Sequence, residues 1–86
     1  MPTISAFYGI VIAMFFNDHD PPHFHARYAE DRARIAIATG QPLDGDLPPR
    51  ATRLVKEWAE LHREELEEDW RLAQELRPLN PIERLP

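Results

Sequence analysis

The chain has 86 residues, a formal net charge of −5 at pH 7 and no cysteine. This length predicts a single domain over residues 1–86 with one modest core, and it leaves little room for a deep substrate cavity in one copy. The lack of cysteine excludes disulfides and thiolate metal sites, and the acidic balance makes direct nucleic-acid binding unlikely.

The distribution of apolar residues gives no reason to expect a membrane protein. The longest apolar run, Ile10–Phe16, is too short to span a bilayer, and the N-terminus lacks the basic and apolar regions of a signal peptide. We therefore expect a cytoplasmic protein.

The first half of the chain predicts a small antiparallel β-meander of three to four strands. Its apolar segments are rich in β-branched and aromatic residues, and turn-forming residues separate them. Both faces of the second segment are apolar, which predicts an interior strand. The expected strands are Thr3–Phe7, Ile10–Phe16, His23–Tyr28 and Arg32–Ala38, within residues 3–38, and Leu43–Leu47 is expected to be a connector.

From Pro49 to about Leu76 the apolar residues follow a helical period. Proline suits a first helical position, and nothing interrupts the run before Arg77-Pro78. One long amphipathic helix is predicted, with an apolar stripe that contains Trp58 and Leu61. The fold class is thus α+β, a meander packed on one C-terminal helix. The proline-containing tail, residues 77–86, either docks on the body or frays.

One helix covers only one face of such a sheet. The second apolar face of Ile10–Phe16 would then be open, which soluble monomers rarely tolerate. We therefore expect a protein partner, either a second copy or a small cognate protein. The alternatives are that the sheet curls on itself or that the tail lies across the open face.

The most informative segment is Asn17–Ala26, because it holds three of the four histidines. His23 and His25 alternate along a predicted strand and so leave the same face, where they are candidate catalytic residues or metal ligands. His19 lies across the Pro21-Pro22 turn and is a third candidate ligand for a divalent metal such as zinc, and Asp18 or Asp20 is expected to be a further ligand or to bond to a ligand. The alternative is that these histidines only cap backbone groups or bond within the turn.

The fourth histidine, His62, falls in the apolar stripe of the predicted helix, and Asp69 follows two turns later. A polar group that faces the sheet must find a partner. We therefore expect His62 and Asp69 to join the strand histidines in one cluster if the two faces meet; otherwise His62 bonds to a backbone carbonyl.

Two stretches give the chain a family resemblance. The first runs from Met1-Pro2-Thr3-Ile4-Ser5 through Phe7-Tyr8-Gly9-Ile10 to the Asn17–Ala26 motif, and the second from Leu47-Pro48-Pro49 to His62. Together they resemble the short prokaryotic proteins catalogued as domain of unknown function 4160. The resemblance implies a partner in a small two-gene cassette that is reminiscent of toxin–antitoxin pairs, and it implies no assigned active site.

The leading functional expectation is a protein-binding component of a two-gene, toxin–antitoxin-like module, which acts through its apolar sheet face and its acidic helix. The alternative is an enzyme, either a metal-dependent hydrolase or a metal-free nuclease in which His23 or His25 acts as acid or base. A third possibility is a metal-binding module without catalysis.

Overall fold

The computed structural model describes residues 2–86, which form five strands followed by two helices. This confirms the α+β class. None of the helices in residues 2–86 is long and apolar enough to cross a membrane. The elements are β1 (Thr3–Phe7), β2 (Ile10–Ala13), β3 (His23–Tyr28), β4 (Asp31–Ala36), β5 (Pro42–Gly45), α1 (Pro49–Leu61) and α2 (Arg63–Gln74).

The strands form one antiparallel sheet in the order β1-β2-β3-β4-β5, so each strand pairs with its neighbour in sequence. Tyr8 and Gly9 both have positive φ and join β1 to β2 in a two-residue turn, which is the geometry that matches strand twist. The bounds of β1 and β3 are those expected from the sequence, whereas β2 ends at Ala13.

The prediction of three to four strands is wrong, because Pro42–Gly45 forms a fifth strand where a connector was expected. All four residues are exposed, so no apolar alternation marks the strand. It is held by pairing with β4 and by Asp44, whose carboxylate accepts hydrogen bonds from the Arg34 guanidinium at 2.6–3.0 Å. Gly45 has a φ of +82°, and a Cβ there would collide with the backbone of Arg32.

The single long helix is also wrong, because the helical path breaks at His62, which has φ −119° and ψ 26°. The expected stripe is also too wide at the end of α1: Trp58 is fully buried, whereas Leu61 is 63% exposed. The imidazole of His62 stays at the edge of the core and bonds to Glu65 instead of entering it. A straight helix would place this polar ring in the core without a partner, which is costly.

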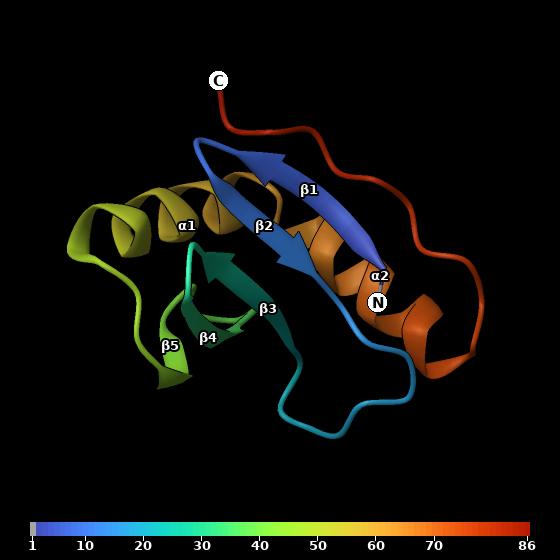
Figure 1. Cartoon of the computed structure of the whole chain (residues 1–86). Coiled ribbons are helices and arrows are strands. Elements are labelled where there is room, and N and C mark those ends of the chain that lie inside the picture. Colours follow the sequence, from blue (N-terminus) through green and yellow to red (C-terminus); the bar gives the residue numbers. More distant parts are fainter. Residues whose placement is uncertain (1) are drawn as a thin grey trace.

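Both helices lie on one side of the sheet (Figure 1). One continuous core fills the space between the helices and the sheet. It is built from the inward residues of every strand except β5 together with one face of each helix. Its largest fully buried side chains include Trp58, Phe24, Ile10, Ile12, Met14, Ile35 and Leu66.

The tail docks on the body, which settles the alternative that the sequence left open. It runs along the outside of β1 (Figure 1), and the Ile82 N–H donates to the Ile4 carbonyl at 2.8 Å. Ile82 and Leu85 are buried in the core. The Trp58 indole N–H donates to the Glu83 carbonyl at 2.8 Å.

Candidate functional site

The segment that links β2 to β3 is tied to the C-terminal end of α2. The Asn17 N–H donates to the Ala73 carbonyl at 3.1 Å, and Nε2 of Gln74 donates to the Asp18 carbonyl at 2.9 Å. Backbone groups at helix ends have no partner inside the helix and are free to hold a neighbouring loop. These bonds place Asp18 beside the beginning of β3.

His23 is the most enclosed histidine of the chain, with 1% of its surface exposed and its ring 5.3 Å from that of Trp70. Its Nδ1 lies 2.8 Å from the Pro21 carbonyl oxygen. A carbonyl oxygen only accepts, so Nδ1 carries the proton and Nε2 is the nitrogen with the available lone pair in the neutral ring.

That lone pair faces another acceptor, because His23 Nε2 lies 2.9 Å from Oδ2 of Asp18. Two acceptors at this distance repel each other unless something positive lies between them. A second proton on His23 satisfies the contact and makes an ion pair. A metal ion satisfies it as well, and a histidine that binds a metal commonly donates its other N–H to a carbonyl, as His23 does.

His25 completes the group from the next position on the same face of β3. Its Nε2 lies 3.5 Å from Asp18 Oδ2, is buried and has no hydrogen-bond partner among residues 2–86. The Phe15 ring packs edge-on against the imidazole at a centroid distance of 4.4 Å. Burial lowers the pKa of His25, and the contact with Asp18 offsets this only in part. The neutral imidazole is therefore favoured.

Asp18 is the centre of the group. Burial acts to raise its pKa, but the hydrogen bond from the His19 N–H and the contacts with His23 and His25 outweigh burial, so the pKa lies below its ordinary value. The side chains of Asp18, His23 and His25 each offer one ligand atom, and these three atoms lie within 4.8 Å of one another. Two imidazoles and one ionised carboxylate suit either metal binding or a stored proton.

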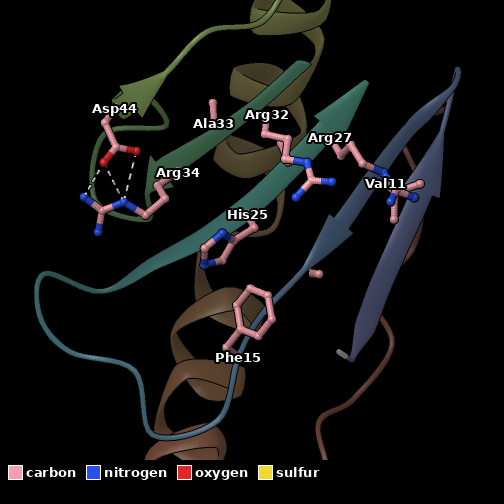
Figure 2. A pocket seen from close by; sticks show the side chains of 10 residues that line it. Val11, Phe15, His25, Arg27, Arg32, Ala33, Arg34 and Asp44 are labelled. Carbon is pink, nitrogen blue, oxygen red and sulfur yellow. Dashed lines mark hydrogen bonds and ion pairs between the residues drawn. The ribbon is translucent and has the colours of Figure 1, made fainter. Parts of the chain in front are cut away.

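His25 also lines a cavity of about 180 Å³ on the outer face of the sheet, the face opposite the helices. The floor contains Val11 and Ala13, and Phe15 stands at one end (Figure 2). Three arginines surround the floor, Arg27 from β3 and Arg32 and Arg34 from β4. The side of β2 that we expected to be uncovered and apolar is thus uncovered, but its surroundings are basic.

His19 is not part of the group of three converging ligands. Its side chain is 88% exposed, and its Nδ1 lies 3.4 Å from the other carboxylate oxygen of Asp18. Of the candidate ligands named from the sequence, the structure therefore brings together His23, His25 and Asp18 and leaves His19 out of the group.

Comparison with family models gives one match, to the domain of unknown function 4160 (DUF4160), over residues 9–71. The chain belongs to this family. The match spans most of the chain and includes the whole segment Asn17–Ala26, so the Asp18 cluster lies inside the family domain. No curated protein and no solved structure matches the chain.

In this DUF4160 chain His62 and Asp69 do not join the strand histidines, which corrects the expectation of one cluster. Nδ1 of His62 lies 2.6 Å from Glu65 Oε1, at the break between the helices. Asp69 is fully buried, and its Oδ1 accepts the Asn80 N–H at 2.8 Å. The physical reason is the break at His62 together with the docked tail, which supplies the partner of Asp69.

Asp69 gives the DUF4160 chain a testable pH dependence. Burial raises its pKa above the ordinary value of 3.8, and Glu68 and Glu65 act in the same direction. The folded state thus holds a proton that the unfolded state loses, and this contribution to stability is present in acid and is lost as the pH rises through the raised pKa. In the part of the chain that the structure describes, Oδ2 of Asp69 has no hydrogen-bond partner.

We therefore expect Asp69→Asn to become more stable relative to the wild type as the pH rises from below 3.8 towards neutrality. The amide oxygen can still accept the Asn80 N–H, and no buried charge forms. Urea unfolding at a series of pH values measures the difference. Glu67→Gln removes an exposed carboxylate of the same helix and is the control. Its free energy of unfolding should change with pH in parallel with that of the wild type. If the free energies of unfolding of Asp69→Asn and the wild type differed by the same amount at every pH, the expectation would be contradicted.

Sequence reasoning missed the arginine-lined cavity of this DUF4160 chain. Arg32 and Arg34 alternate along β4, directly opposite Arg27 and His25 on β3. Alternation of this kind places all four side chains on one face. The alternation is visible in the sequence, but only the strand register shows that Arg32 and Arg34 of β4 lie beside Arg27 and His25 of β3.

Proposed function

We propose that the chain is the protein-binding component of a two-protein, toxin–antitoxin-like module, and that the partner docks on the outer face of the sheet. The uncovered face with its arginine-lined cavity carries this proposal (Figure 2). The family resemblance supports the two-protein arrangement.

The chemistry of this face selects the partner. Within residues 2–86, Arg34 pairs with Asp44, whereas Arg27 and Arg32 form no ion pair. Opposite charges across an interface guide association and exclude wrong partners. The partner therefore presents an acidic segment with an apolar side chain, the carboxylates to Arg27 and Arg32 and the apolar group to the floor at Val11.

A second copy of the chain fits this face less well. Two copies that meet through the same face bring arginines against arginines, which is unfavourable. A copy that offers the acidic side of α2 instead makes a head-to-tail contact that does not close on itself unless it forms a ring. A separate cognate protein meets neither difficulty.

An enzyme with the Asp18 cluster at its centre is the second candidate, since arginines beside a histidine suit a phosphate ester. Of the three cluster residues, however, only His25 lines the cavity. A substrate in the cavity would reach one histidine and neither of its partners. The site therefore supports docking better than catalysis.

Reversal of charge on the outer face tests the proposal. In Arg27→Glu/Arg32→Glu, we expect the affinity for the small protein encoded beside this chain to fall by at least about tenfold, which corresponds to about 1.4 kcal/mol. Isothermal titration calorimetry at low and high salt gives the affinity, and the salt dependence should weaken in the variant.

The matched control is Arg50→Glu/Arg53→Glu, which makes the same change in net charge on exposed residues of α1. It should bind almost as well as the wild type. Equal losses in both variants would indicate a general charge effect and would contradict a partner on the sheet. If the wild type forms a concentration-dependent dimer and only the Arg27/Arg32 variant abolishes it, the partner on this face is a second copy of the chain and not a cognate protein.

A further inference from the structure

We propose that Asp18, His23 and His25 form a binding site for one divalent transition-metal ion of the zinc class. This goes beyond the docking function, because it concerns Asp18 in the loop between β2 and β3 and two histidines of β3, and it holds whether or not a partner binds on the sheet.

The distances between the ligand atoms match such a site. In a tetrahedral zinc site with bonds of about 2.0–2.1 Å, neighbouring ligand atoms lie about 3.3 Å apart. The Asp18 Oδ2 atom lies 2.9 Å from His23 Nε2 and 3.5 Å from His25 Nε2. All three ligand atoms lie within 4.8 Å of one another, so side-chain rotations can bring them to the distances of such a site.

The orientation of the rings matches it as well. His23 Nδ1 is occupied by the Pro21 carbonyl, which directs the lone pair of Nε2 at Asp18. His25 Nε2 points to the same oxygen and is a buried nitrogen without a hydrogen bond, which folded proteins seldom leave unexplained. A cation between these three atoms satisfies all of them at once.

The ligand set also selects the kind of ion. Two imidazoles and one carboxylate suit zinc and its neighbours in the first transition row, whereas calcium and magnesium prefer oxygen ligands alone. The chain supplies three ligands, and water completes the tetrahedron. The ion would link the loop at Asp18 to the beginning of β3. It would thereby restrict motion at the end of the cavity that Phe15 and His25 line.

The test uses the chain without a histidine tag, stripped of metal by a chelator and then titrated with Zn²⁺. We expect one equivalent to bind and the melting temperature to rise. His25→Gln and Asp18→Asn should each weaken binding by at least about tenfold and abolish most of the thermal shift. Neither residue is fully buried, so both variants should fold, which circular dichroism verifies.

Two other histidines of the chain provide matched controls. His19→Gln lies next to the site, and His62→Gln removes a histidine that also faces a carboxylate, Glu65. Both should bind Zn²⁺ like the wild type. Co²⁺ is a second probe, because a tetrahedral site with nitrogen ligands gives visible absorption bands that His25→Gln should lack. A folded wild type that binds no stoichiometric Zn²⁺ overturns the proposal, as does a loss of binding in His19→Gln but not in Asp18→Asn.

Discussion

Trp58→Ala should lower the free energy of unfolding by about 3–5 kcal/mol, a large part of the total for a domain of this size. Trp58 is fully buried at the centre of the core, with the rings of Phe7 and Phe24 at centroid distances of 5.4 and 5.6 Å. Its removal leaves a cavity between the sheet, α1 and the tail. Urea unfolding followed by circular dichroism measures the loss.

Two further variants separate the contributions at this position. Trp58→Phe keeps most of the packing and removes the N–H that donates to Glu83, so a smaller loss of about 1–2 kcal/mol is expected. Leu61→Ala lies on the same helix at an exposed position and should change stability by less than about 0.5 kcal/mol. Similar losses at Trp58 and Leu61 would contradict the burial of Trp58 and the exposure of Leu61.

Ile82→Ala in the tail should lower the free energy of unfolding by about 2–5 kcal/mol, the usual range for a buried isoleucine. Its side chain is 5% exposed and belongs to the core, and its N–H pairs with the Ile4 carbonyl of β1. The tail therefore acts as part of the fold and not as an appendage. The same unfolding experiment gives the value.

Arg84→Ala is the matched control, because Arg84 lies in the same segment and is exposed. It should have almost no effect. A chain that ends at Leu76 should lose the cover of Trp58 and the partner of Asp69 together and fail to fold stably. A stable truncated chain, or an Ile82→Ala variant as stable as Arg84→Ala, would show that the tail does not support the core.

The strands of the first half could be predicted because their signal is local. β1 and β3 have the bounds that their apolar and turn-forming residues indicate, and the same face for His23 and His25 follows from strand alternation. β5 could not be predicted in this way. Its exposed residues carry no apolar pattern, and the pairing partner that makes them a strand lies elsewhere in the chain.

The candidate site was predicted in part for the same reason. The spacing of His23 and His25 indicates two imidazoles on one face, whereas the choice of Asp18 over His19 depends on how the loop is tied to α2 through Asn17 and Gln74. The surroundings of Asp69 likewise depend on Asn80, which belongs to the tail.

By itself the sequence determined the α+β class, the family and the local elements, because these depend on residue type and on periods of two or 3.6 residues along a short stretch. Only the tertiary structure decided the break at His62, the docked tail, the arginine-lined face and the convergence of Asp18 with His23 and His25. The docked tail, the arginine-lined face and the convergence at Asp18 depend on contacts between distant segments, whose energies no local pattern in the sequence records.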